Sequence, residues 1–417
     1  MNNKKLLVLL CSITFKILSD EPKFFKAGHF YSEPRLAEKW LTTIDLEFEF
    51  GKTTVGYNNC GMKTNILNIY GDENIKQLAN GVPETFLKKS PNPFLNTLFL
   101  EETGINFGKI QFNGKFKVSE MVLDYYQNFS KGFFSQIYLP YFFKLNIYDI
   151  NFDDLSSPAN SKPDANYQDW KNFVNNLEKN IANYGLSIGP ICRKGPGDLL
   201  LFFGWTFNHE DTEYIDFIDA TFKAGVLFPT GTKKDLTKVF DITTGYNGFW
   251  GVPISFKASF GLYEWLTFGG HAAAIFFKDR IETVKFKTAF EQNGFIKLAS
   301  GPANIHQGTN WNLGLFIKAD HFMNGISVIL GYRYDQKNRW VITPCDLETY
   351  NFDVVNSDSM LQRWNMHTIN FLAEYDFESE RCHHLPKIQV FIDIPVSGKL
   401  IFKTAMAGFT LGIDYEW

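Results

Sequence analysis

Gly408-Phe409-Thr410-Leu411-Gly412-Ile413-Asp414-Tyr415-Glu416-Trp417, the last ten residues of the chain, alternate between two kinds of side chain. Every second residue is apolar and the others are polar or small, which is the period of a β-strand with one apolar face. This face runs to the terminal aromatic residue and would be costly in water unless an apolar medium covers it. A second sheet or a helix could cover it in a soluble protein, and a bilayer could cover it in a closed barrel.

The same pattern recurs along the chain, beginning at residues 40–50, where Ile, Leu and Phe alternate with Asp and Glu. We expect twelve such strands, at residues 40–50, 109–126, 133–147, 198–207, 214–228, 248–262, 265–277, 311–321, 326–335, 364–377, 386–394 and 408–417. The second is counted as one long strand with a bulge near Gly108, because its phase shifts there. Two strands in its place would give thirteen and spoil the even number.

The connections between these strands alternate in length. The short ones are residues 128–132, 208–213, 263–264, 322–325 and 378–385, and the long ones are 58–103, 149–196, 229–247, 278–310, 336–363 and 395–407. An up-and-down barrel in a membrane has tight periplasmic turns on one rim and long external loops on the other. The sequence therefore predicts an all-β protein, a transmembrane antiparallel barrel of about 12 strands in the outer membrane, with both termini in the periplasm.

The composition agrees with alternating strands. Aromatic residues make up 17% of the chain, yet its mean hydropathy is only −0.17, as expected when every second residue of many strands is apolar. No apolar run reaches the roughly 18 residues that a membrane helix needs. The net charge of −4 includes no basic stripe, so we expect no nucleic acid among the partners.

The N-terminus resembles a secretory signal, with Lys4 and Lys5 followed by an apolar run at residues 6–15. We assign residues 1–19 to a signal peptide, 20–39 to a periplasmic segment and 40–417 to the barrel. Cys11 is read as a residue of the signal peptide rather than a lipidation site, because the preceding Leu10 is large.

One helix is expected within the long connection at residues 149–196. Between residues 166 and 183 the apolar side chains form a single helical stripe. They are Trp170, Phe173, Val174, Leu177 and Ile181. This helix would either pack on its own loop and the barrel mouth or act as a lid.

The chain end is similar to the C-terminal signal that the insertion machinery of bacterial outer membranes reads on barrel proteins. The residues that carry this similarity are Phe409, Leu411, Ile413, Tyr415 and Trp417. The resemblance implies that the barrel-insertion machinery is a partner, beside the lipid bilayer itself.

Two further motifs resemble the outer-membrane transporter family of the phenol meta-pathway (MetA-like) type. Gly195, Gly197 and Asp198 match its G-x-G-D strand start, and residues 228–231, Phe-Pro-Thr-Gly, match its L-P-T-G strand end with Phe for Leu. Residues 139–141, Leu-Pro-Tyr, are similar to an earlier strand of that family. The resemblance implies a barrel that passes small, often apolar or aromatic compounds. From the residues alone, the glycines of the first motif allow a sharp turn into a strand, and the proline of the second ends a strand at the rim.

We predict no catalytic, metal or cofactor site, and so no enzyme. Cys382-His383-His384 is the only dense cluster of potential ligands, and it has no second ligand pair at useful spacing. His271 and His367 lie on predicted strands, where an outer-membrane phospholipase would place a His–Ser pair, but no serine motif accompanies them.

Three cysteines, Cys60, Cys192 and Cys345, fall on predicted external loops, while Cys382 falls on the opposite rim. A disulfide cannot span a membrane, so at most one bond forms among the three, and Cys60–Cys192 is the preferred pair. The polar positions of the strands should face the lumen. The lumen candidates are Asp45, Glu47, Glu49, Lys115, Lys117, Lys223, Lys318, Arg333, Glu374 and Asp414.

Together these patterns predict passive passage of small molecules through a lumen lined by side chains, and the family resemblance implies that these molecules are apolar or aromatic. Residues 149–196 or the segment before Trp40 would gate it. Both charge signs occur among the lumen candidates, which favours a narrow passage with internal salt bridges over a strongly ion-selective pore. The alternatives are a closed barrel whose loops bind partners, or an outer-membrane phospholipase.

Overall fold

The computed structural model describes residues 41–78, 80–83, 108–129, 131–156, 165–210, 215–323, 325–377 and 384–416. The expected signal peptide, the segment 20–39, Cys382, His383 and Trp417 lie outside these residues.

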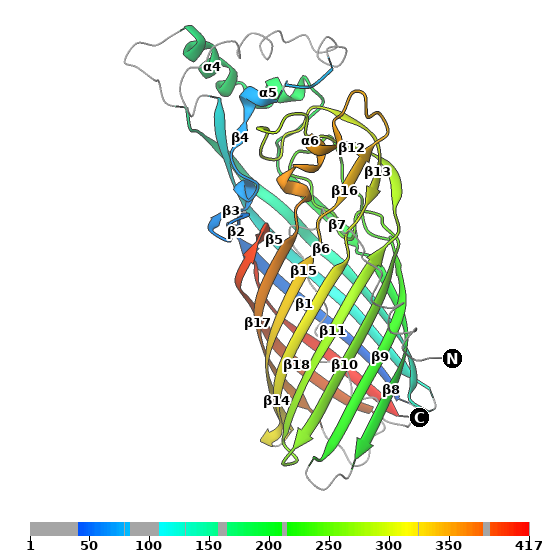
Figure 1. The fold of residues 1–417 in the computed structure, drawn as a ribbon. Helices are drawn as coiled ribbons and strands as arrows, with labels where there is room; N and C mark the ends of the chain where they lie inside the picture. Colours follow the sequence, from blue (N-terminus) through cyan, green and yellow to red (C-terminus); the bar gives the residue numbers. More distant parts are fainter. Residues whose placement is uncertain are drawn as a thin grey trace, which may run out of the picture.

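Within the described residues, twelve long antiparallel strands form a closed barrel (Figure 1). They are β1 (Leu41–Thr53), β5 (Lys109–Asn128), β6 (Phe133–Asp154), β8 (Leu199–Glu210), β9 (Phe217–Phe228), β10 (Gly251–Leu262), β11 (Leu266–Phe277), β14 (Asn310–Met323), β15 (Ile326–Lys337), β17 (Trp364–Asp376), β18 (His384–Lys399) and β20 (Ala405–Glu416). The first and last strands close it, with Ile44 opposite Ile413 and Leu46 opposite Leu411. The predicted fold class is confirmed.

The long second strand is a single element, as predicted. Its pairing with β6 shifts register between Asn113 and Lys115 and again between Ser119 and Glu120. Gly108 instead precedes β5 in the left-handed region, with φ at 82°. The bulge expected near Gly108 therefore lies further along the strand.

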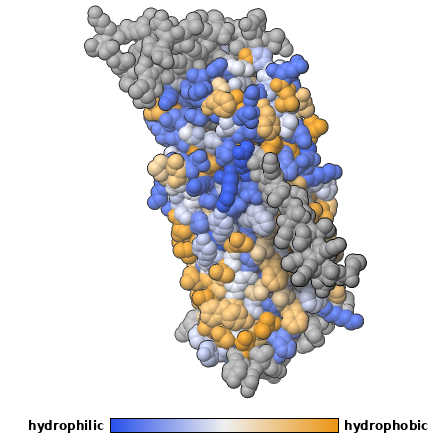
Figure 2. Space-filling model, in the orientation of Figure 1, coloured by the Kyte–Doolittle hydropathy of each residue, from blue (hydrophilic) through white to orange (hydrophobic). Residues whose placement is uncertain are grey.

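The outer face of the barrel is apolar. On β8, for example, Phe203, Trp205 and Phe207 are 62%, 43% and 45% exposed. Figure 2 shows apolar side chains gathered around the lower part of the barrel and mainly polar ones above. An exposed apolar belt around a closed barrel, with every strand of the belt paired on both sides, is stable in a lipid layer and not in water. The protein is therefore an outer-membrane barrel.

No helix among the described residues is long and apolar enough to cross a membrane. The predicted helix occurs as two short ones, α4 (Ala165–Asn175) and α5 (Leu177–Ala182). The chain breaks between them at Asn176, where φ is −117° and ψ is 25°. All five residues of the predicted stripe are buried.

Above the belt, the long connections fold into a layer that we call the external cap, made of residues 54–78, 80–83, 165–198, 229–250, 278–309, 338–363 and 400–404. Its strands are β2 (Val55–Tyr57), β3 (Lys63–Asn65), β4 (Glu73–Asn74), β7 (Ile191–Pro196), β12 (Arg280–Lys285), β13 (Ser300–His306), β16 (Val341–Pro344) and β19 (Ile401–Phe402). Its other helices are α6 (Phe352–Asn356) and three 3-10 turns at Ile66–Asn68, Ile75–Gln77 and Ser359–Leu361.

The external cap has a hydrophobic core of its own. Trp170, Phe240, Phe295 and Phe402 are at most 4% exposed and belong to one buried cluster with the upper parts of β5 and β6. The sequence predicted these segments as long loops, with one helix between residues 166 and 183. The cap is a folded layer over the barrel mouth instead.

Candidate functional site: lumen and external pocket

Most of the expected lumen residues lie on the strand faces opposite the apolar belt. Asp45, Glu49, Lys223, Arg333 and Glu374 are buried there, each less than a tenth exposed. Glu47, Lys318 and Asp414 also alternate with apolar residues of their strands and are partly buried.

Lys115 and Lys117 are placed differently: they are exposed and alternate with buried Phe116 and Val118, so they face outward. This part of β5 has apolar residues on its inner face because that face packs against the external cap. Lys115 pairs with Asp149 at 3.0 Å, an exposed pair that contributes little to stability. The expectation that both lysines line the lumen was wrong.

Among the described residues, the inner face holds three clusters of opposite charges. Lys387 lies 3.1 Å from Asp45 and 3.6 Å from Asp414. Lys318 lies 3.1 Å from Asp320 and 3.2 Å from Glu374.

The third cluster centres on Arg333, whose Nε donates to Asp335 at 2.9 Å and whose Nη1 lies 3.6 Å from Asp393. Asn370 donates a further hydrogen bond to Asp393 at 2.8 Å, and Asn312 donates one to Asp335. Since Arg333 is 2% exposed and Asp335 0%, this cluster fills its part of the barrel.

The two family-like motifs meet at the upper end of β8. Asp198 accepts hydrogen bonds from the backbone amides of Gly231, at 2.8 Å, and Tyr246. The hydroxyl of Thr230 donates to the carbonyl of Gly197 at 2.6 Å. The motifs therefore fix the connection after β9 to the start of β8, a structural role.

Cys60, Cys192 and Cys345 are free thiols in the described part of the chain, so the preferred Cys60–Cys192 bond is not formed. Cys60 lies in the turn between β2 and β3, next to β19, whereas Cys192 lies on β7, which pairs with β6.

His367 does not pair with a serine. Its Nδ1 is hydrogen-bonded to the hydroxyl of Tyr332 at 2.6 Å. Ser397 lies opposite it on β18, but the described hydrogen bonds do not join the two. The activated nucleophile of a His–Ser phospholipase is therefore not assembled at this position.

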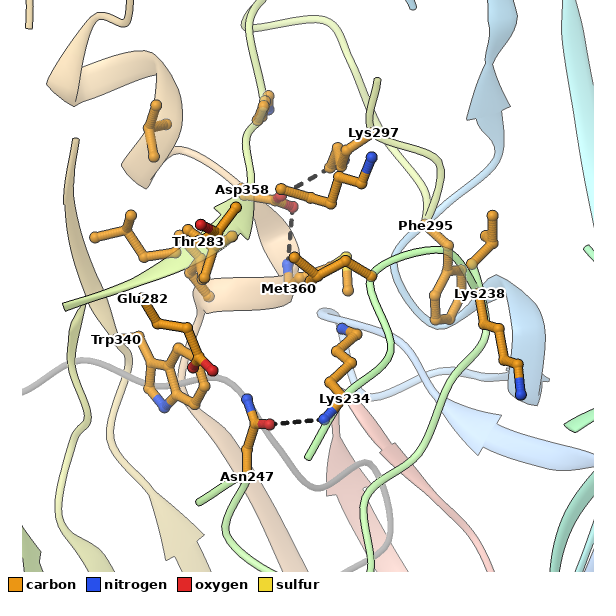
Figure 3. Close-up of a pocket in the computed structure, with 18 of the residues that line it drawn as sticks. Lys234, Lys238, Asn247, Glu282, Thr283, Phe295, Lys297, Trp340, Asp358 and Met360 are labelled. Carbon is orange, nitrogen blue, oxygen red and sulfur yellow. Dashed lines mark hydrogen bonds and ion pairs between the residues drawn. The ribbon is translucent and has the colours of Figure 1, made fainter. Parts of the chain in front are cut away.

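The external cap encloses a cavity of about 310 Å³, which we call the external pocket (Figure 3). Its walls come from residues 234–247, 282–297 and 340–361 together with Leu186. The apolar lining is Leu186, Leu236, Val239, Val284, Phe295, Trp340, Ile342, Val355, Met360 and Leu361, and the charged lining is Lys234, Lys238, Lys285, Lys287, Lys297, Glu282 and Asp358.

Several backbone and side-chain contacts hold these walls. Asn247 accepts a hydrogen bond from the amide of Lys234 at 2.9 Å, and Asp358 accepts one from the amide of Met360 at 3.0 Å (Figure 3). The carboxylate of Glu73, which is fully buried, accepts hydrogen bonds from the amides of Phe295 and Ile296. Burial raises the pKa of Glu73 to about 7, although Lys297 and these amides oppose the shift.

The pocket was not predicted. Its residues come from four connections far apart in sequence, and most of them follow no helical or strand period. The sequence signal available beforehand was the cluster Lys285-Phe286-Lys287 near Lys297, which has the spacing of a strand with one basic face.

No protein-family model matches this chain, and the search of curated proteins gave no match. Among solved structures it is similar to the COG4313 outer membrane channel from Pseudomonas putida F1, with 12% identity over 94% of this chain and 98% of that chain and a TM-score of 0.45. The Ralstonia pickettii toluene transporter TbuX is 8% identical over 91% of this chain and 89% of its own, with a TM-score of 0.31. Pseudomonas aeruginosa OprD is 6% identical over 96% and 98%, with a TM-score of 0.28.

Proposed function

We propose that the protein is an outer-membrane channel through which small molecules, including apolar and aromatic ones, pass by diffusion. The observation that supports this most directly is the polar inner face of the barrel. The clusters around Lys387, Lys318 and Arg333 are not what stability alone requires, because apolar side chains of similar volume stabilise a buried site as well or better. A polar face can be wetted when its ion pairs separate.

The apolar or aromatic nature of the cargo is supported by the walls of the external pocket. Trp340 and Phe295 lie on opposite sides of it (Figure 3). Concave sites of a few hundred Å³ with mainly apolar walls and a few polar groups are typical of small-molecule binding. A molecule held there would be positioned above the lumen.

A closed barrel that binds partners through its cap is the second candidate. It is favoured by the burial of the lumen clusters, with Arg333 2% and Lys387 6% exposed. In that case the ion pairs are permanent and the external cap is the functional surface.

Single-channel recording in planar bilayers separates the two candidates. We expect steady openings from the refolded protein and none from detergent alone or from heat-denatured protein. Silence from protein that still migrates as a folded barrel would favour the closed barrel. Liposome swelling with sugars, amino acids and aromatic compounds then ranks the cargo.

A further inference from the structure

Two lysines that are close together in sequence line the external pocket. Neither Lys285 nor Lys287 has a hydrogen bond or an ion pair among the described residues. Lys287 is only 4% exposed. Burial lowers the pKa of both side chains, because water is removed from the ammonium groups. An unpaired ammonium at such a position costs free energy of folding.

Asp358 and Glu291 attract Lys287 electrostatically, but no described contact makes either of them an ion-pair partner of Lys287, and the carboxylates that line the pocket have other close partners. Asp358 lies 3.5 Å from Lys297, and Figure 3 shows this ion pair as a dashed line. Glu282 forms an ion pair with Arg280 and lies 3.6 Å from Lys233. Of the charged groups that line the cavity, five are lysines and two are carboxylates, so the pocket keeps a positive charge.

Beside these charges, the pocket offers an apolar surface. Ten of its described lining residues are apolar, including the aromatic rings of Phe295 and Trp340. A strongly hydrated inorganic anion would leave this surface in contact with water. A neutral hydrocarbon would leave Lys285 and Lys287 without partners. A ligand with both an anionic group and an apolar body would pair with the lysines and also cover the apolar lining.

We propose that the external pocket binds a small organic carboxylate, with its carboxylate at Lys285 and Lys287 and its body against Trp340, Phe295 and the aliphatic walls. This deepens the proposed channel function and depends on it for its purpose, since the pocket would capture cargo above the lumen. Binding itself needs only the folded cap.

Isothermal titration of the full-length protein in non-ionic detergent tests the proposal. Benzoate is the probe, and three molecules control for its parts: benzyl alcohol lacks the charge, benzylammonium reverses it, and acetate lacks the ring. We expect saturable binding of benzoate at least about tenfold tighter than that of each control, since a charge-assisted contact in a buried site is worth that factor. Equal binding of benzyl alcohol or acetate, or no binding of benzoate, would overturn the proposal.

Substitution of the two lysines locates the site. Lys287→Met should weaken benzoate binding about tenfold or more, Lys287→Arg should keep most of it, and Lys179→Met, at an exposed position on α5, should leave it unchanged. Lys285→Met provides a second, independent variant should Lys287→Met not fold. Undiminished binding by both Met variants would refute the assignment.

Thermal stability without ligand distinguishes a binding lysine from a structural one. Because no hydrogen bond or ion pair holds the ammonium of Lys287 among the described residues, Lys287→Met should keep or raise the unfolding midpoint while it loses binding. A lower midpoint together with lost binding would mean a structural role and would count against the proposal. If benzoate binds but the protein does not conduct, the proposed channel function is contradicted and the proposed binding site is not. If the protein conducts but benzoate does not bind, the binding site is contradicted and the channel function is not.

Discussion

The carboxylate of Asp198 accepts a hydrogen bond from the backbone amide of Gly231 at 2.8 Å, across 33 positions of sequence. The same carboxylate accepts from the amide of Tyr246, and a Cβ atom at Gly245 would collide with it. The start of one strand thus holds the connection that follows the next strand. Glycine at 231 and 245 lets the backbone approach the carboxylate this closely.

Asp198→Asn should loosen this connection. The amide side chain keeps one acceptor and turns an N–H group towards a backbone N–H, so one buried hydrogen bond is lost at a residue only 2% exposed. We expect a loss of about 1 to 3 kcal/mol, measured as a lower unfolding midpoint and faster proteolysis within residues 229–247. Asp346→Asn, which removes the carboxylate of an exposed turn, is the control. Equal effects of the two variants would argue against the special role of Asp198.

Arg333→Met should affect both stability and conductance. It leaves Asp335 and Asp393 buried without their shared cation, which typically costs about 3 to 5 kcal/mol. Adding Asp335→Asn and Asp393→Asn to this variant should recover most of the loss. In planar bilayers the single variant should conduct more than the parent and prefer cations. Unchanged current and selectivity would show that this cluster does not line the permeation path.

The sequence was sufficient to predict the barrel because each strand carries its own evidence. The alternation at residues 44–50 and at 408–416 needs no knowledge of the neighbouring strand, since both strands face the same lipid and the same interior. For Lys115 and Lys117 the alternation predicted the wrong face of the strand. Their strand continues above the belt, where an outward position is wet and the inner face is apolar.

The external cap could not be predicted in the same way. Phe240 and Phe295 stack edge to face with ring centroids 5.2 Å apart, yet they come from different connections and neither lies in a periodic run. Their burial depends on long-range contacts, which leave no local pattern. The external pocket could not be predicted for the same reason, because its walls form only when these connections pack together.

The stability of the external cap should depend on the titration of Glu73. Burial raises the pKa of this carboxyl to about 7 from 4.5, so the folded protein binds the proton more tightly than the unfolded chain does. Stability should therefore fall as the pH rises from about 4.5 to 7, by on the order of a few kcal/mol, and then level off.

Glu73→Gln removes this titration and should flatten the dependence, whereas the exposed Glu348→Gln should not. Thermal unfolding in detergent at pH 5, 6, 7 and 8 measures how the stability of the parent and of each variant depends on pH. A parent curve that stays level from pH 5 to 7, or a Glu73→Gln curve with the same slope as the parent, would contradict the assignment.

The lipid contact of the barrel can be tested with two exposed apolar residues that differ in height. Leu411 on β20 is 46% exposed within the apolar belt, and Ile281 on β12 is 71% exposed in the external cap. Arginine at a lipid-facing position near the bilayer centre costs about 2 to 4 kcal/mol, whereas it is harmless at a wet surface. Leu411→Arg should thus lower the folding yield and stability in lipid vesicles, and Ile281→Arg should leave both unchanged. If the two variants fold equally well, the face that carries Leu411, Leu46 and Ile413 is not in contact with lipid, and the barrel does not sit in the membrane as described.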